Sequence, residues 1–323
     1  GPRGTGPPPM AAAVKSQLGP VCVVVRSLAG DRVLELELAV GSTVSHVKAA
    51  VARNWDVPPA FQRLVLGAEP LGDLEPVAGG CYQLVVSLDE ARRDVESGDS
   101  LIRARALEEL GGLGRRGGPA ATAVASSCLE DEDDAVRQAA AHALAEVAEE
   151  GDAGVVAALR DRLRDDDDPF VKEAVVAGLA QVARRGDGCT VDALAECLAE
   201  DENPWVRQAA TEAIARLAEE GDGRAIAGLL PCLDDDYADV RLAAVVSLAQ
   251  VACQGDRRSV SALCGCLRDP AEELRSTAAT ALAKVSGKGN KRAIIALTSC
   301  LKDRDEGVRR AVERALEDLG ARA

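Results

Sequence analysis

The sequence predicts two folded parts, a small α+β domain near the N-terminus and an all-α solenoid over the C-terminal two-thirds. Seven dipeptides that join an aliphatic residue to a base recur at intervals of 34 or 35 residues from Ile102 to Val308. Before them, β-rich runs surround one short helical segment. Aromatic residues make up only 2% of the 323 residues, which favours closely packed helices over a β-sandwich or barrel for most of the chain.

The N-terminal part has the element order β-β-α-β-β. Two β-rich runs flank Ala29-Gly30-Asp31, and leucine alternates with glutamate in the second run, as in a strand with one buried face. Ser42 or Thr43 can cap a helix that continues through Ala52, before Pro58 and Pro59 end the region. Two more β-like runs cover residues 63–66 and 82–88.

This segment resembles the ubiquitin-like family. The resemblance rests on VVVRSLAGDRVLELEL, on STVSHVKAAVARNWDVPPAFQRLVLGAEPLGD and on YQLVVSL. It implies a ubiquitin-like (β-grasp) domain over residues 20–90, with Leu28, Val65 and Val85 where that family exposes a small apolar contact patch. The patch would recruit ubiquitin-pathway partners, although ordinary sheet residues explain these three positions equally well. No Gly-Gly follows Leu88, so we expect an integral domain and not a conjugated modifier.

The composition indicates which kinds of binding partner and which cellular compartment suit this protein. The net charge of -15 argues against binding to nucleic acid or to an anionic membrane surface, and no apolar run is long enough to span a bilayer. Residues 1–19, which are rich in Pro and Gly, are expected to form a disordered tail. Five cysteines precede a leucine at one repeat position, which indicates a small core residue in a reducing compartment. We therefore expect a monomeric cytoplasmic protein, with a nuclear location as the alternative.

Each repeat has the composition of a helix pair. In the unit that begins at Asn203, Asn203-Pro204 can start a helix with an apolar stripe, and Gly221 can end that helix. Asp222 can then cap a second helix, and an acidic loop leads into the next unit. We expect about six such pairs plus a terminal helix, Glu306 to Leu319, in a solenoid over residues 99–323.

The pattern xDxxVRxxAxxALAxLAxxGD is similar to the HEAT-repeat family, in particular the group named after phycobilisome lyases. That resemblance implies an α-solenoid, whereas the functions of the family range over scaffolds, adaptors and a few enzymes. We expect the repeated base to pair with an acidic residue of its own or an adjacent loop, such as Asp134 or Asp168. A ligand-binding ladder of bases is the less favoured alternative.

The leading hypothesis is a non-enzymatic protein-interaction scaffold. We expect a groove lined by the second helix of each pair, and aromatic residues beside the acidic turns that either anchor a partner or cover the turn. The candidate protein-binding residues on the solenoid are Gln138, His142, Glu173, Gln208, Glu212, Arg216, Gln250, Phe170, Trp205 and Tyr237.

No catalytic, metal or cofactor motif is recognisable in the sequence. The two histidines lie in different domains, and neither HExxH, CxxC nor a P-loop is present. The alternatives to a scaffold are a HEAT-type enzyme or enzyme subunit, similar to a bilin lyase or to deoxyhypusine hydroxylase, and a structural subunit of a larger complex.

Overall fold

The structure is a computed structural model that describes residues 20–27, 32–67 and 69–321. The chain divides into two compact units that meet between Ser87 and Leu88. The tail expected at residues 1–19 and the patch residue Leu28 lie outside the described residues.

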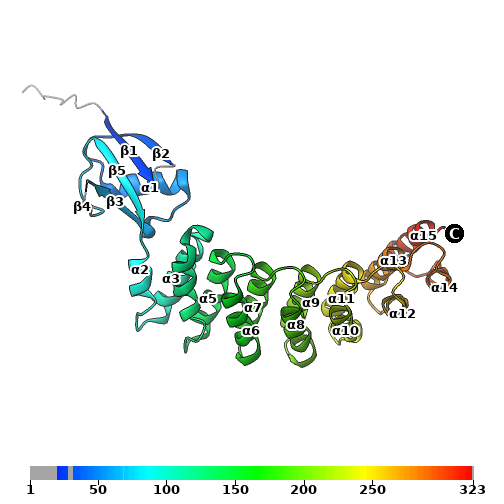
Figure 1. Cartoon of the computed structure of the whole chain (residues 1–323). Coiled ribbons are helices and arrows are strands. Elements are labelled where there is room, and N and C mark those ends of the chain that lie inside the picture. The colour runs from blue at the N-terminus through cyan, green and yellow to red at the C-terminus, as the bar shows by residue number, and fades with distance from the viewer. Residues whose placement is uncertain (1–19, 28–31, 68, 322–323) are drawn as a thin grey trace, which may run out of the picture. The chain divides into compact units, whose positions relative to one another are not determined.

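The first unit is a mixed five-stranded sheet with the strand order β2-β1-β5-β3-β4 (Figure 1). Strand β1 pairs antiparallel with β2 and parallel with β5, which in turn pairs antiparallel with β3. Side chains alternate across the strands, so Val25, Leu64 and Leu84 are buried together with Val47 and Val51 of the helix α1. The elements are β1 (Val21–Ser27), β2 (Val33–Leu38), α1 (Val44–Trp55), a 3₁₀ turn (Pro59–Phe61), β3 (Gln62–Leu66), β4 (Glu69–Pro70) and β5 (Gly80–Val86).

Three elements of this unit differ clearly from the sequence prediction. Strand β5 begins and ends two residues before the predicted run at residues 82–88. Helix α1 continues three residues past Ala52, because Trp55 is 92% buried there, and it ends at Asp56 in the left-handed conformation (φ 54°). The two-residue strand β4 was not predicted, since so short a segment carries no periodicity.

The second unit is a stack of helix pairs. It starts with a short helix, α2 (Asp89–Asp94), whose first two residues were assigned to the first domain by the sequence prediction and whose others lie between the two predicted domains. We call the first helix of each pair, which carries the aliphatic–basic dipeptide, the VR helix. In Figure 1 the VR helices follow one another in one row and the second helices in another, and neighbouring VR helices are in contact. The VR helices are α3 (Ser100–Gly111), α5 (Asp134–Val147), α7 (Pro169–Val182), α9 (Pro204–Leu217), α11 (Ala238–Val251), α13 (Glu272–Ser286) and α15 (Glu306–Asp318).

Short polar caps and small buried residues shape each pair. In α9 the Asn203 side chain accepts hydrogen bonds from the N–H groups of Trp205 and Val206, and Pro204 occupies the first turn. Alanines in the buried stripe let neighbouring VR helices approach closely. The second helices are α4 (Gly118–Ser127), α6 (Ala153–Asp165), α8 (Gly188–Glu200), α10 (Gly223–Leu229), α12 (Arg257–Cys266) and α14 (Lys291–Ser299), with 3₁₀ turns at Gly114–Gly117 and Pro231–Asp234.

A glycine in the turn between the two helices links successive pairs. Helix α9 ends at Leu217, so the prediction that Gly221 ends the helix is wrong by four residues, although Gly221 does adopt the left-handed conformation (φ 84°). Its N–H donates to the carbonyl oxygen of Val251, at the end of the next VR helix, over 2.6 Å. The same bond joins Gly151 to Val182, Gly186 to Leu217, Gly255 to Val285 and Gly289 to Leu319.

Replacing Gly221 by alanine is expected to lower the free energy of unfolding by about 1–2 kcal/mol, the cost of a left-handed non-glycine residue. The new Cβ would also lie 2.6 Å from the Cys253 sulfur, so the neighbouring turn must shift. Urea denaturation followed by far-UV circular dichroism measures the change. Gly223 is the matched control, since a Cβ there meets nothing within 4 Å. Equal losses for both variants would contradict this account of the turn.

Candidate functional site

An arginine–aspartate ladder runs along the starts of the VR helices. Arg137 donates from Nε and Nη2 to the two carboxylate oxygens of Asp166, over 2.7 and 3.1 Å, and from Nη1 to the carbonyl oxygen of Asp131, over 2.9 Å. Each base thus binds the backbone of its own turn or the carboxylate of the next turn, or both. The pairs are Arg103–Asp131, Arg137–Asp166, Lys172–Asp201, Arg207–Asp235, Arg241–Asp269 and Arg275–Asp303.

These contacts confirm that the repeated base pairs with acidic residues of an adjacent loop, but the partners named from the sequence are wrong. Asp168 caps α7 by accepting from the N–H groups of Phe170 and Val171, and Asp134 is the first residue of α5. The partner is instead the aspartate six residues before the next base. Because the donor groups of each base are already bonded within the stack, the ladder stabilises the solenoid and leaves few donors free to bind a ligand.

Asp166 has the most enclosed carboxylate of the ladder. Its side chain is 1% exposed, accepts from the N–H of Asp168 and also lies 3.2 Å from Nε of Arg162. Burial alone would raise the pKa of this carboxyl, but the hydrogen bonds from Arg137 and from the N–H of Asp168, together with the positive charges of Arg137 and Arg162, outweigh burial and hold the pKa below its ordinary value. The carboxylate therefore stays ionised at neutral pH, accepts hydrogen bonds from Arg137 and forms an ion pair with Arg162.

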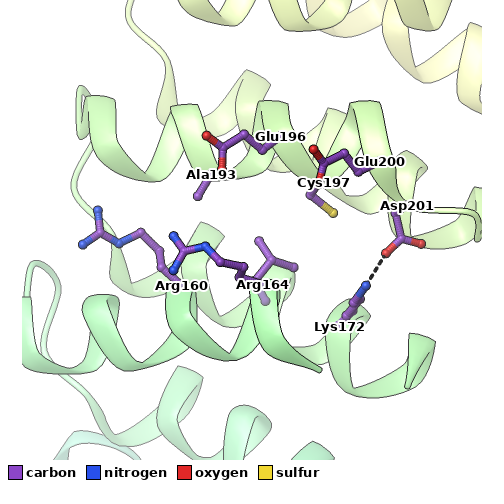
Figure 2. A pocket seen from close by; sticks show the side chains of 9 residues that line it. Arg160, Arg164, Lys172, Ala193, Glu196, Cys197, Glu200 and Asp201 are labelled. Atoms are coloured by element: carbon purple, nitrogen blue, oxygen red, sulfur yellow. Dashed lines mark hydrogen bonds and ion pairs between the residues drawn. The ribbon is translucent and has the colours of Figure 1, made fainter. Parts of the chain in front are cut away.

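The ladder contains one lysine, Lys172, beside a hollow of about 210 Å³ between α6 and α8 (Figure 2). Its Nζ lies 2.8 Å from the Asp201 carboxylate. Cys197 also lines this hollow, and burial raises the pKa of its thiol to about 12. A thiol with that pKa is protonated at neutral pH and is a poor nucleophile. The rest of the lining is Arg160, Leu163, Arg164, Ala193, Glu196 and Glu200.

A more apolar hollow lies between the VR helices α9 and α11. Its volume is about 360 Å³, and the aliphatic side chains of Leu242 and Val246 line it. Val246 is 41% exposed, which is unusual for a large aliphatic residue of this unit. The structure brings four of the predicted groove residues together at this hollow: Gln208, Glu212, Arg216 and Gln250.

The predicted location of the groove needs one correction. The groove was predicted on the second helices, but all seven candidate residues lie on VR helices, which come first in their pairs. Gln138 and His142 belong to α5 and Glu173 to α7, outside the α9–α11 hollow. Leu242 and Val246 were not among the predicted groove residues. They could have been found by aligning the repeats, because they stand where the preceding unit has Gln208 and Glu212.

A second hollow on the same row, between α13 and α15, has a different character. Its volume is about 560 Å³, and hydroxyl groups and bases line much of it. Thr280 stands there in place of Val246, and Arg314 follows one unit later. These two hollows of the VR row thus differ in lining: Leu242 and Val246 line the one between α9 and α11, whereas hydroxyl groups, bases and alanines line this one.

The three aromatic residues of the second unit are all exposed. Phe170 is 61% exposed, Trp205 66% and Tyr237 54%. They lie at the starts of α7, α9 and α11. The Arg207 guanidinium lies 5.8 Å from the centroid of the Tyr237 ring, so one ring also has a cation–π contact within the solenoid.

Two of the three predicted patch residues of the first unit are described. Val65 and Val85 are half-buried, and each stands next in sequence to a residue, Leu64 or Leu84, that faces the core. Since neighbouring residues of a strand point to opposite faces, both valines lie on the outer face of the sheet, on adjacent strands. The structure thus places them together on one surface.

The remaining reactive side chains do not gather into a centre within the described residues. All ten cysteines are free thiols, and burial raises the pKa of Cys232 and Cys266 to about 11. His46 accepts at Nδ1 from the N–H of Thr43 at the start of α1, whereas His142 is on α5. No group of three or more His, Cys, Asp or Glu suited to a metal ion occurs in the described ranges. Nor does any helix there have the length and apolar character needed to cross a membrane.

Comparison with known proteins places the repeats in a wider context. The sequence profile of HEAT repeats matches residues 91–180, 176–249 and 226–317. The solved structure of the Escherichia coli protein YibA is similar, with 22% identity, 73% of this chain and 82% of that chain covered, and a TM-score of 0.52. At this identity the similarity shows the fold alone.

Two other solved structures have lower TM-scores. Human deoxyhypusine hydroxylase in complex with glycerol matches at 20% identity over 71% of this chain and 83% of its own, with a TM-score of 0.35. The Caldiarchaeum subterraneum ubiquitin matches at 29% identity over 21% of this chain and 95% of its own, with a TM-score of 0.20. A search of curated protein sequences finds no match.

Proposed function

Because the chain belongs to the HEAT-repeat family, we propose that it is a non-enzymatic scaffold that binds a protein partner along the row of VR helices. Stacked helix pairs present an extended surface on which each repeat can contribute contacts, and this architecture is widely used for protein recognition. A cytoplasmic location and a monomeric state belong to the same proposal.

The observation that carries the proposal is the hollow between α9 and α11. The aliphatic side chains of Leu242 and Val246 line it together with the polar side chains of Gln208, Glu212 and Gln250. An apolar centre with a polar rim is the arrangement found where proteins bury an anchoring side chain of a partner. A volume of about 360 Å³ is large enough to hold one such side chain.

The first unit would contact a second partner. In this proposal Val65 and Val85, on the outer face of the sheet, take the role of the contact patch of ubiquitin-like proteins and recruit ubiquitin-pathway components. Two weak contacts on one chain raise the effective concentration of one partner near the other.

Replacing Val246 by glutamate is expected to weaken partner binding at least about tenfold, because a charge would be buried against an apolar anchor. The measurement is affinity capture from extract with the full chain, followed by titration of the captured partner against the purified protein. Val246 is exposed, so the variant should keep its fold, which far-UV circular dichroism checks.

Ile295 is the matched control. It is an aliphatic residue of the second-helix row, on α14, and is 71% exposed. Ile295→Glu introduces the same charge on the other row and should leave binding unchanged. If both variants bind alike, the VR row is not the binding face.

A further inference from the structure

The aromatic residues of this protein are distributed unevenly between core and surface. The chain has two Phe, two Trp and two Tyr. In the first unit Trp55, Phe61 and Tyr82 are buried. The other member of each kind is in the solenoid, where all three are more than half exposed at the starts of successive VR helices. None of these three rings serves the core, so core packing does not explain their presence. We call Phe170, Trp205 and Tyr237 the aromatic edge.

Exposed acidic residues occur in the same three turns. Asp167 precedes Phe170, Glu202 precedes Trp205, and Asp236 precedes Tyr237, and all three are exposed. The bases at the start of the helices that follow are already bonded to the ladder aspartates, so they do not neutralise these carboxylates.

The turns before α13 and α15 have no aromatic residue and contain exposed bases. The turn before α13 has an exposed Arg268, and the turn before α15 has an exposed Lys302 and Arg304. The turn before α5 has the exposed Glu130 and Glu132 but no aromatic residue, so exposed carboxylates are not confined to the aromatic edge. What distinguishes the three turns of the aromatic edge is that an exposed ring and an exposed carboxylate occur together.

We propose that the aromatic edge binds an extended protein segment whose lysine or arginine side chains stack on the rings of Phe170, Trp205 and Tyr237. A cation over an aromatic face is attracted by the electron density of the ring, most strongly by that of tryptophan. The acidic residues beside each ring add long-range attraction for the same cation. The apolar stems of lysine and arginine can also cover the exposed carbon surface.

The repeat spacing specifies the register of the segment. Phe170 and Trp205 each stand directly before the aliphatic residue of their dipeptide, so we expect their rings to be about as far apart as packed helices, about 8–10 Å, whereas Tyr237 stands two residues earlier in its repeat. A polyproline II segment advances about 9 Å in three residues, and an extended strand about 10 Å. A basic residue at every third position would therefore meet successive rings. This surface is distinct from the hollow between α9 and α11, so either proposal can fail without the other.

Titration with a synthetic peptide tests the inference. The probe is a peptide of about 12 residues with lysine at every third position in a proline-rich background. Trp205 is the exposed one of the two tryptophans, so a Trp55→Phe background isolates its fluorescence. Saturable binding that changes this fluorescence and weakens as salt is added is the expected result.

Substitutions then assign the surface. Trp205→Ala should weaken binding of a dye-labelled probe about tenfold, and the triple alanine variant of the aromatic edge at least about fiftyfold. Leu101→Ala is the matched control. Leu101 occupies the same repeat position as Trp205 and is 77% exposed, but it has no aromatic ring and lies outside the aromatic edge. It should bind as the parent does.

Three outcomes would overturn the inference. The first is equal binding of a peptide with glutamate in place of lysine. The second is unchanged binding by the triple variant, provided that its circular dichroism spectrum matches the parent. The third is loss of binding in Val246→Glu but not in Trp205→Ala, which would assign the peptide to the hollow between α9 and α11.

Discussion

Replacing Asp166 by alanine is expected to lower the free energy of unfolding by about 3–5 kcal/mol, the usual cost of removing one partner of a buried ion pair. The Asp166 carboxylate is 1% exposed and accepts from Arg137 while lying 3.2 Å from Nε of Arg162. Alanine would leave both guanidinium groups without their carboxylate in a partly enclosed site. It would also remove the acceptor for the N–H of Asp168.

Urea denaturation of the full chain, followed by far-UV circular dichroism, measures this loss. Asp167→Ala is the control, since Asp167 is exposed, and its effect should stay within about 0.5 kcal/mol. A loss of the same size in both variants would mean that net charge, and not the ion pair, determines stability. The paired change Arg137→Met with Asp166→Leu should recover part of the loss, because it removes both charges from the buried site.

The stability of the solenoid is expected to fall steeply as the pH drops below about 4. Burial alone would raise the pKa of most ladder carboxyls, but the hydrogen bonds from the arginines and from backbone N–H groups, together with the charges of nearby arginines, outweigh burial and hold these pKa values below the ordinary value. For Asp303 the hydrogen bond from Arg275 is the largest effect and acts in the same direction. The carboxyls concerned are those of Asp131, Asp166, Asp235, Asp269 and Asp303.

The sign follows from proton binding. Around pH 4 the unfolded chain, with ordinary pKa values, binds more protons than the folded chain does, so acidification favours unfolding. The stabilisation is complete above the ordinary aspartate pKa and is lost as the pH falls toward the lowered values. Urea denaturation at a series of pH values measures the slope. Each proton contributes about 1.4 kcal/mol per pH unit.

Asp166→Asn removes one titrating group whose pKa is lowered in the folded chain and should make the slope shallower. A free energy of unfolding that stays constant between neutral pH and pH 3 would contradict the role given to the ladder.

The helices of the solenoid could be predicted from the sequence because each repeat carries its own local signals. The aliphatic residue of each dipeptide from Val136 to Val308 is at most 1% exposed, which is what a column of core positions requires. The pairing of each base was predicted as well, but its partner was not, since four consecutive aspartates at 165–168 have the same chemistry. The backbone path of the turn decides which of them reaches Arg137.

The candidate binding surface was only partly predictable. Every helix of an amphipathic pair has an exposed face, and periodicity identifies that face without telling which row leaves hollows between neighbours. That depends on helix spacing, a property of the stack. Comparing the same position across repeats is more informative, and it would have singled out Leu242 and Val246 as large aliphatic residues at positions where the other repeats have a polar residue or alanine.

The ladder has a direction, which allows whole repeats to be gained or lost during evolution. Each unit offers a carboxylate to the unit before it and a base to the unit after it, with Arg275–Asp303 as the last of these pairs. Every junction therefore has the same two halves, and units are interchangeable parts. Loss of residues 167–201 as a block would leave Asp166 facing Arg137 and Arg207 facing Asp235, so arrays of this kind can lengthen or shorten by whole units without new junctions having to evolve.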